Sequence, residues 1–301
     1  GSIRPTGRGS SAARPARPFP DIRDFGMILD TDRVSSLLRE TAELKILPRF
    51  RALGEGDTHE KGPGDLVTIA DLESEKHLTP ALKRLLPGSE VVGEEAASAN
   101  SSVLDLLKGD SPVWIIDPVD GTANFADGSE MFAVIVALVQ GGEVLAGWIY
   151  DPIRDRMAVA EAGEGAYLDD KRMRVSQPVP LSEMLGIISL KFVPTEERPV
   201  LRARAQELRR FFSLGCAGQE YLQLAEGRTH FSIYRRIMPW DHAAGWLIHR
   251  EAGGVGAFAD DTPYDATIHQ GRLIMAPDGD SWRALRDLLF PDPADRVEHT
   301  A

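Results

Sequence analysis

The chain has 301 residues, of which 43% are hydrophobic and 27% charged, so it can bury a full core and has the balance of an ordinary soluble globular protein. Its net charge of −12 argues against a nucleic-acid groove, which depends on clustered Lys and Arg, and we expect no nucleic-acid partner. No apolar run approaches the ~20 residues of a membrane helix, and we expect no membrane contact.

The first 20 residues are rich in Pro, Arg, Ser and Gly and carry almost no large apolar side chains. We therefore predict that residues 1–20 form a disordered basic tail. A solvated terminus is the plain interpretation of this tail, and an arm that binds a partner or nucleic acid is the alternative.

Two amphipathic helices are predicted ahead of the first strands. Between residues 31 and 53 apolar residues recur at helical spacing, with Asp30 or Thr31 as the cap and Pro48 as a kink or interruption. A glycine-rich stretch follows, and residues 72–86 then have the pattern of a second helix, which Pro87-Gly88 ends.

Several strands are predicted next. Residues 113–116 form a short apolar run, and residues 132–139 and 144–150 are typical of a hairpin. Two further strand-like runs cover residues 157–160 and 166–168.

The rest of the chain alternates short strands with helices, which indicates the α/β class. The predicted strands are residues 187–190, 211–214, 231–234 and 272–275, and the predicted helices are residues 197–210, 216–226, 241–252 and 281–290. We expect a boundary near residues 165–180. It would separate an α+β half, residues 21–170, with most of the candidate metal ligands, from an α/β half, residues 171–295, that supplies Asp241 and the substrate contacts.

The most informative segment is residues 114–125, Trp-Ile-Ile-Asp-Pro-Val-Asp-Gly-Thr-Ala-Asn-Phe. Its apolar strand delivers Asp117 to a strand end, where α/β sheets commonly place their sites, and Asp120 follows three residues later, so the two carboxylates can converge. Gly121 and Thr122 would begin a helix whose free amides can hold a phosphate. The plain alternative is a turn, because Asp, Pro and Gly are also turn residues.

Other segments add carboxylates to this set. Glu94 follows an apolar run, Asp65 lies beside a strand-like piece, and Asp241 begins a helix, where alone it would be an ordinary N-cap. Oxygen ligands with no nearby Cys or His cluster suit Mg²⁺ better than Zn²⁺. His242, next to Asp241, is interpreted as a packing residue rather than a metal ligand.

Glu94-Glu95, residues 117–125 and residues 240–254, in this order and at this spacing, resemble the signatures of the inositol monophosphatase family. The resemblance extends from about residue 31 to about residue 290. This family consists of Mg²⁺-dependent, Li⁺-sensitive phosphomonoesterases related to fructose-1,6-bisphosphatase. It implies an α/β fold in alternating layers, αβαβα, which is the α+β layered sandwich of the sugar-phosphatase type, and a homodimer.

The same resemblance implies a ligand set for two or three Mg²⁺ ions. Glu94, Asp117 and the Val119 carbonyl would hold the first ion, and Asp117, Asp120 and Asp241 would hold the second, so that Asp117 bridges them. Two such ions ~3.5–4 Å apart can serve the attacking water and the leaving oxygen of an in-line displacement.

The resemblance also implies catalytic roles around these ligands. Asp65 and Thr122 would orient or deprotonate the attacking water, with Glu94 as a further catalytic group, and the Gly121 and Thr122 amides would bind the phosphate. Metals and amides would supply most of the barrier reduction by electrostatic stabilisation. Lys61 and Thr68 are given supporting roles only.

Two positions differ from the family pattern and bear on the substrate. The family often has a glutamate seven residues before the aspartate of its last motif, and this chain has Tyr234 there, followed by Arg235 and Arg236. We hypothesise that the substrate carries another anionic group; the alternative is that both arginines face solvent or form ion pairs. Cys216 and Ala217 are predicted to line the substrate pocket, and the alternative for Cys216 is a small buried core thiol.

These residues predict a phosphoric monoester hydrolase that acts on a small phosphorylated polyol, sugar or related metabolite, with inositol-1-phosphate as the default substrate. Histidinol phosphate, fructose-1,6-bisphosphate and phosphoadenosine phosphate are alternatives within the same fold. A non-catalytic regulatory binding protein is the alternative from another class. The single cysteine excludes an internal disulfide framework and favours a cytoplasmic location, although a periplasmic protein can also lack disulfides.

Overall fold

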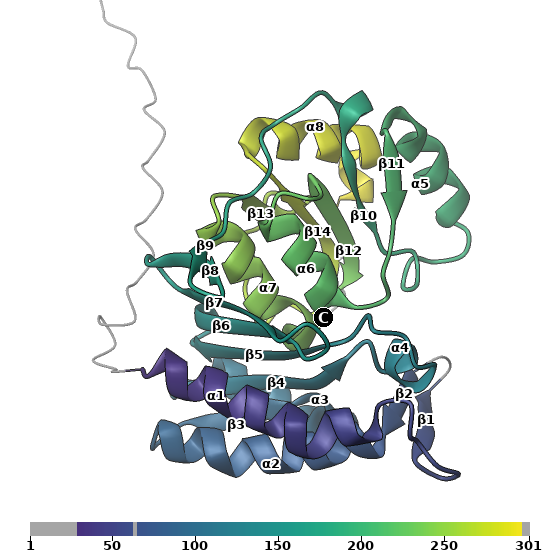
Figure 1. The fold of residues 1–301 in the computed structure, drawn as a ribbon. Coiled ribbons are helices and arrows are strands. Elements are labelled where there is room, and N and C mark those ends of the chain that lie inside the picture. Colours follow the sequence, from purple (N-terminus) through teal and green to yellow (C-terminus); the bar gives the residue numbers. More distant parts are fainter. Residues whose placement is uncertain (1–28, 63–64, 297–301) are drawn as a thin grey trace, which may run out of the picture.

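The computed structural model describes residues 29–62 and 65–296, which form five layers in the order helix, sheet, helix, sheet, helix (Figure 1). The predicted tail, residues 1–20, lies outside the described residues. The layered α/β architecture predicted from the sequence is confirmed, and the two large sheets come from successive parts of the chain.

The first sheet has seven strands in the order β3-β4-β5-β6-β7-β8-β9, of which β3 and β4 are parallel and the other neighbours antiparallel. Its strands are β3 (Glu90–Gly93), β4 (Val113–Asp120), β5 (Ala133–Gln140), β6 (Glu143–Asp151), β7 (Arg156–Glu161), β8 (Gly165–Leu168) and β9 (Lys171–Arg172). All five strands that the sequence predicted before residue 170 lie in this sheet.

The second sheet has the order β11-β10-β12-β14-β13, with β10 parallel to both of its neighbours. Its strands are β10 (Leu185–Ile188), β11 (Arg210–Phe212), β12 (Phe231–Arg236), β13 (Val255–Phe258) and β14 (Gln270–Ala276). A separate antiparallel pair, β1 (Thr58–Gly62) and β2 (Asp65–Thr68), leads into the first sheet.

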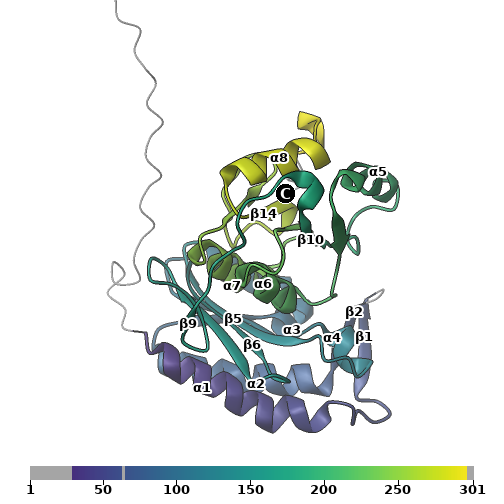
Figure 2. The ribbon, with the colours of Figure 1, turned by 45° about the horizontal axis from the view of Figure 1, so that its top comes forward.

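Three layers of helices cover these sheets. The helices are α1 (Thr31–Thr41), α2 (Ile69–Leu85), α3 (Glu94–Ala99), α4 (Thr122–Ala126), α5 (Arg198–Arg204), α6 (Ala217–Ala225), α7 (Pro239–Glu251) and α8 (Gly279–Leu289). Helices α1 and α2 pack on the outer face of the first sheet, α6 and α7 lie between the sheets, and α5 and α8 pack on the outer face of the second (Figures 1 and 2). The α6–α7 layer therefore joins both halves of the chain.

The first two helices begin at side-chain caps. The Asp30 carboxylate accepts a hydrogen bond from the Arg33 amide at 3.0 Å, and the helical path continues beyond α1 as a π turn and a 3-10 turn up to Arg49. Helix α2 begins three residues before the predicted start, because Thr68 and Asp71 form a reciprocal capping box. The sequence therefore predicted both helices, but it placed the start of α2 three residues too late.

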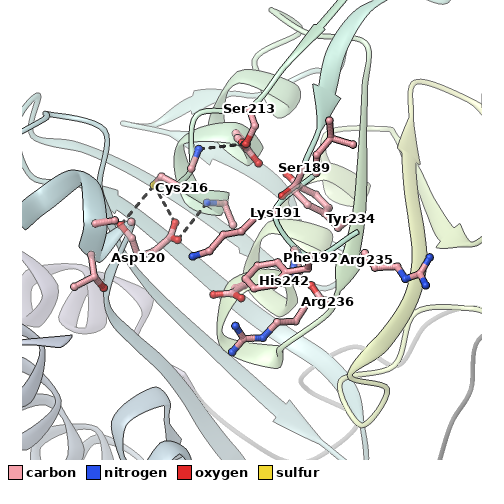
Figure 3. A pocket seen from close by; sticks show the side chains of 18 of the residues that line it. Asp120, Ser189, Lys191, Phe192, Ser213, Cys216, Tyr234, Arg235, Arg236 and His242 are labelled. Atoms are coloured by element: carbon pink, nitrogen blue, oxygen red, sulfur yellow. Dashed lines mark hydrogen bonds between the residues drawn. The ribbon is translucent and has the colours of Figure 1, made fainter. Parts of the chain in front are cut away.

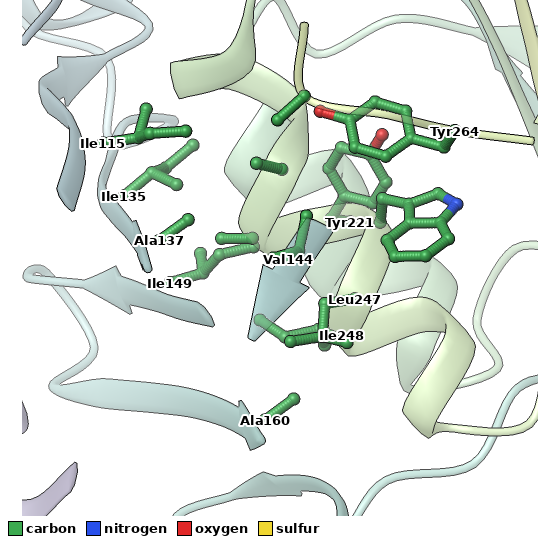
Figure 4. Close-up of a cluster of buried hydrophobic side chains, with 14 of the residues drawn as sticks. Ile115, Ile135, Ala137, Val144, Ile149, Ala160, Tyr221, Leu247, Ile248 and Tyr264 are labelled. Atoms are coloured by element: carbon green, nitrogen blue, oxygen red, sulfur yellow. The ribbon is translucent and has the colours of Figure 1, made fainter. Parts of the chain in front are cut away.

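The position of strand β5 in the fold explains why its residues form one continuous apolar run in the sequence. Ala133, Ile135 and Ala137 face the α6–α7 layer, while Val134 and Val136 face α1 and α2. Helices cover both faces of the strand, so both faces need apolar side chains and the sequence does not alternate between apolar and polar residues. Figure 4 shows the inner face of this sheet meeting Leu247 and Ile248 of α7.

Several short elements, among them β1, β9, β13 and α3, were not predicted from the sequence. Strand β13 contains a glycine and only four residues, and α3 has six residues directly after the predicted apolar run. Elements this short carry too few periods for their pattern to stand out. Within residues 29–62 and 65–296, none of the helices combines the length and the apolar character needed to cross a bilayer.

Helix α7 needs a glycine where it crosses α6. A Cβ atom at Gly245 would lie 2.1 Å from the ring of Tyr221, which is fully buried. We expect Gly245→Ala to lower the free energy of unfolding by about 1–3 kcal/mol, because the ring has no space to move into. Urea unfolding measures this loss. Gly62→Ala is the control, since a Cβ there meets nothing within 4 Å, and an equal loss in both variants would contradict the packing argument.

Candidate active site

The candidate site lies where the carboxyl ends of β3 and β4 meet the first turn of α7. Strands β3 and β4 are parallel and pair Gly93 with Ile116, so the next residues, Glu94 and Asp117, lie side by side. Helix α7 brings Asp241 to the same place from the other half of the chain. A cavity of about 510 Å³ opens here, and Glu94, Asp117, Asp120 and Asp241 all line it.

Three aspartates form the tightest group in this cavity. One carboxylate oxygen from each of Asp117, Asp120 and Asp241 lies within 4.8 Å of the other two. Asp117 and Asp120 are only 2% and 7% exposed. Glu94 lines the cavity just outside this group, and its Oε1 accepts a hydrogen bond from the Lys61 ammonium at 2.8 Å.

The acids of this site destabilise one another's charged forms. Burial, followed by repulsion from Glu94, Asp120 and Asp241, raises the pKa of Asp117 well above its ordinary range. Burial raises the pKa of Asp241 in the same way, with Asp120 and Glu94 adding to it and Arg236 opposing it. A bound cation relieves such repulsion, because it stabilises the ionised form of every carboxylate around it.

The donor set fits Mg²⁺. All candidate ligand atoms are oxygens, from carboxylates and from the Val119 carbonyl, and hard divalent cations prefer such ligands. The His242 side chain is not available as a ligand, since its Nε2 contacts the Arg236 carbonyl at 3.0 Å and its Nδ1 contacts the Tyr221 hydroxyl at 3.1 Å. Burial lowers the pKa of His242 to about 3, so the ring is neutral, in agreement with the packing role predicted for it.

The Thr122 hydroxyl contacts an aspartate that the sequence analysis did not single out. Its hydroxyl lies 3.1 Å from Asp71 Oδ1 and 3.0 Å from the Val119 carbonyl, and it can donate its proton to either. Asp65, which was predicted to act on the water together with Thr122, also lines the cavity, but the carboxylate that contacts the Thr122 hydroxyl is that of Asp71. The signal for Asp71 was present in the sequence, as the acid three residues after the Thr68 cap.

Asp71 is held firmly in place. Its Oδ2 accepts hydrogen bonds from the backbone amide and the hydroxyl of Thr68, at 2.8 Å and 2.6 Å. Burial raises the pKa of Asp71 to about 6, although the hydrogen bonds from Thr68 and Thr122 act in the opposite direction. The supporting role predicted for Thr68 is therefore to fix this carboxylate.

Gly121 has a backbone that requires glycine. Its φ of +84° is left-handed, and a Cβ there would lie 2.8 Å from the Met131 carbonyl oxygen. The turn at Gly121 starts α4 at Thr122 beside the aspartates, and both of these residues line the cavity.

The start of α6 holds Asp120. The Asp120 carboxylate accepts hydrogen bonds from the Cys216 thiol at 3.0 Å and from the amides of Ala217 at 3.2 Å and Gly218 at 2.6 Å (Figure 3). Cys216 is 2% exposed, so it is both a buried thiol and part of the cavity wall. Burial and the Asp120 charge raise the pKa of this thiol, which keeps it a hydrogen-bond donor.

Two further acids, which the sequence reasoning missed, fix the backbone of the site. Glu75 accepts hydrogen bonds from the amides of Glu95 and Ala96, and so holds the start of α3, where Glu94 lies. Glu220 accepts hydrogen bonds from the Ser213 hydroxyl and the Leu214 amide, just before the turn at Cys216. Both lie inside helices far from the motifs, so sequence spacing alone does not single them out.

The side chains of Tyr234 and of the two arginines that follow it point in different directions. Tyr234 lines the cavity but is only 4% exposed, with its ring 4.6 Å from that of His242. The Arg235 side chain turns away from the site, and its guanidinium donates to both oxygens of Glu197, at 2.9 Å and 3.3 Å (Figure 3). The ion pair that was the alternative for both arginines is thus formed by Arg235, whereas Arg236 points into the cavity (Figure 3).

Comparison with known proteins assigns the chain to a family. Residues 31–292 match the inositol monophosphatase family. The chain is 32% identical over 217 residues to an inositol-1-monophosphatase from Bacillus subtilis (strain 168), with 71% of this chain and 79% of that protein covered. It is 33% identical over 229 residues to a Nus factor SuhB from Vibrio cholerae serotype O1, with 73% and 80% covered.

A solved structure of the extragenic suppressor protein suhB from Bartonella henselae superposes with a TM-score of 0.75 at 26% identity, and the match covers 87% of this chain and 99% of that one. The α/β sandwich described above is thus the fold shared by inositol monophosphatases and fructose-1,6-bisphosphatases, as predicted. The chain belongs to the inositol monophosphatase family.

Proposed function

We propose that the protein is a Mg²⁺-dependent phosphomonoesterase that acts on a small phosphorylated polyol or sugar. The observation that carries this proposal is the convergence of Asp117, Asp120 and Asp241, with oxygens within 4.8 Å of one another, at the wall of a cavity large enough for such a ligand. Buried acids with raised pKa values in a cleft are typical of a functional site.

The metal-holding residues would be Glu94, Asp117, the Val119 carbonyl, Asp120 and Asp241. Bound Mg²⁺ makes water more acidic and offsets the negative charge of the phosphate. Asp120 and Asp117 are held for this role by hydrogen bonds, Asp120 from α6 and Asp117 from the Val119 amide at 3.1 Å.

The attacking water would be oriented by Thr122. When the Thr122 hydroxyl donates its proton to Asp71 Oδ1, its lone pairs can accept a hydrogen bond from water, and the water proton can pass through Thr122 to Asp71. A pKa of about 6 suits Asp71 as the final proton acceptor near neutral pH. The amides of Gly121 and Thr122 would bind the phosphate and stabilise the charge that develops on it.

A substrate panel tests this proposal. Phosphate release is measured with inositol-1-phosphate, histidinol phosphate, fructose-1,6-bisphosphate and phosphoadenosine phosphate, each with Mg²⁺ and with EDTA. We expect release from at least one compound with Mg²⁺, its loss in EDTA and its inhibition by Li⁺. Release that persists in EDTA would contradict the metal-dependent mechanism.

A non-catalytic regulatory binding protein is the second candidate, since the relatives include proteins named Nus factors. It would be favoured if no panel compound released phosphate while the purified protein retained a stable partner. The homodimer and the cytoplasmic location stay predictions, the first from the family resemblance and the second from the single cysteine.

A further inference from the structure

The wall opposite the aspartates is cationic. It is built by the segment that follows β10 and by the end of β12, which place Lys191, Phe192 and Arg236 on the cavity. The Lys191 ammonium lies 5.1 Å and the Arg236 guanidinium carbon 4.8 Å from the centroid of the Phe192 ring. Figure 3 shows both cationic groups pointing to the side of the cavity where Asp120 lies.

Neither cation is neutralised by an ion pair. In the part of the chain that the structure describes, no carboxylate oxygen lies within 4.0 Å of the Lys191 or Arg236 charge, whereas the neighbouring Arg235 is paired with Glu197. Phe192 is 40% exposed although it is large and apolar. An aromatic ring attracts a cation that lies over its face, so Phe192 stabilises both charges.

When the aspartates bind divalent cations, their wall of the cavity loses most of its net charge, whereas the wall with Lys191 and Arg236 stays positive. The carboxylates and the metals then compensate each other, while Lys191 and Arg236 keep a positive potential over the remote part of the cavity. A monophosphate of an uncharged polyol brings no negative group to that part. Arg in particular suits phosphate or carboxylate, because its planar fork donates two parallel hydrogen bonds.

We infer that Lys191 and Arg236, spaced by Phe192, form a subsite for a second anionic group of the substrate, a phosphate or a carboxylate remote from the phosphate that is hydrolysed. The inference rests on the proposed function and narrows its substrate class to sugar or polyol bisphosphates and phosphorylated sugar acids. It also assigns to Arg236 the role that the sequence left open between Arg235 and Arg236.

A matched pair of substrates tests the subsite. Fructose 1-phosphate and fructose 1,6-bisphosphate differ only in the second phosphate, and the wild type should have the lower KM for the bisphosphate. Arg236→Gln and Lys191→Gln should each raise the KM for the bisphosphate about tenfold or more, as expected for a lost charge-assisted hydrogen bond, and leave the KM for fructose 1-phosphate unchanged. Arg172→Gln is the control, because Arg172 also stacks on an aromatic ring, at 5.3 Å from Tyr167, but outside the cavity.

The alternative role for Arg236 is to compensate the charge of the nearby Asp241, and this role predicts a different kinetic result. Loss of that role would change kcat for both substrates equally and leave their KM ratio intact, which would overturn the inference.

Calorimetric titration of the same proteins with both sugar phosphates in Ca²⁺ repeats the comparison without turnover. A preference for the bisphosphate that disappears in Arg236→Gln, in a protein that hydrolyses neither compound with Mg²⁺, would support the subsite and contradict the proposed function. Turnover of both compounds, with no preference for the bisphosphate in the wild type or in any variant, would support the proposed function and contradict the subsite.

Discussion

Asp117→Asn should reduce phosphate release by about 1,000-fold or more at saturating Mg²⁺. Asp117 is the aspartate at the centre of the cluster, since Glu94, Asp120 and Asp241 all act on its charge. An amide has the same shape but cannot supply the negative charge that a shared ligand of two cations needs. The measurement is kcat with the best substrate of the panel, alongside the affinity for Mg²⁺ by calorimetry.

The same variant should fold normally. The Val119 amide donates to Asp117 Oδ1, and the asparagine carbonyl oxygen can accept this bond. Because the native pKa of Asp117 is raised, the native state retains a proton that the unfolded chain releases, so metal-free stability falls as pH rises above the ordinary aspartate pKa. In EDTA, Asp117→Asn should therefore lose less stability than the wild type between about pH 5 and about pH 8.

Asp105→Asn is the control for both measurements, because the Asp105 side chain is 72% exposed and does not line the cavity. Urea unfolding in EDTA gives the stability difference. Turnover by Asp117→Asn at the wild-type rate would exclude the metal assignment, and a collapsed fold would show that the charge has a structural role instead.

Asp71→Asn should lower kcat by about 100- to 10,000-fold, with a smaller change in KM, because a general base acts on the transition state rather than on substrate binding. Asp71 is the carboxylate that contacts Thr122, and its pKa of about 6 allows it to receive a proton at neutral pH. The kcat should also fall at low pH in the wild type, as protonation removes the base.

Asp65→Asn is the matched comparison, since Asp65 lines the same cavity without contacting the Thr122 hydroxyl. It should have the smaller effect on kcat. Asp71 and Thr122 should act as one unit, so the double variant with Thr122→Val should be hardly slower than either single variant. A larger loss in Asp65→Asn than in Asp71→Asn would contradict the role of Asp71 and favour Asp65 as the acid that acts on the water.

The fold was largely predictable because its signals are local and repeated. The continuous apolar runs of β5 and β6 and the helical periods of α1, α2 and α7 each persist over more than six residues, and both faces of the first sheet are covered by helices. The short β13 and α3 lacked such repetition, and their existence depends on the neighbours that they pack against.

The candidate site was predictable to the extent that motifs lie at the ends of elements. The convergence of Asp117 and Asp120 followed from their spacing at a strand end, whereas the addition of Asp241 followed from the family resemblance. Side-chain direction did not follow in the same way. Arg235 and Arg236 are adjacent on β12 and point to opposite sides, and which of them faces the cavity depends on the register of β12 with β14.

Anomalous scattering from crystals grown with Mn²⁺ in place of Mg²⁺ tests the central claim most directly. We predict anomalous peaks between the carboxylates of Asp117, Asp120 and Asp241, extending toward Glu94, and none there in crystals of Asp117→Asn. Saturating Mn²⁺ with no peak at these aspartates, or peaks only at exposed acids elsewhere on the surface, would contradict the account.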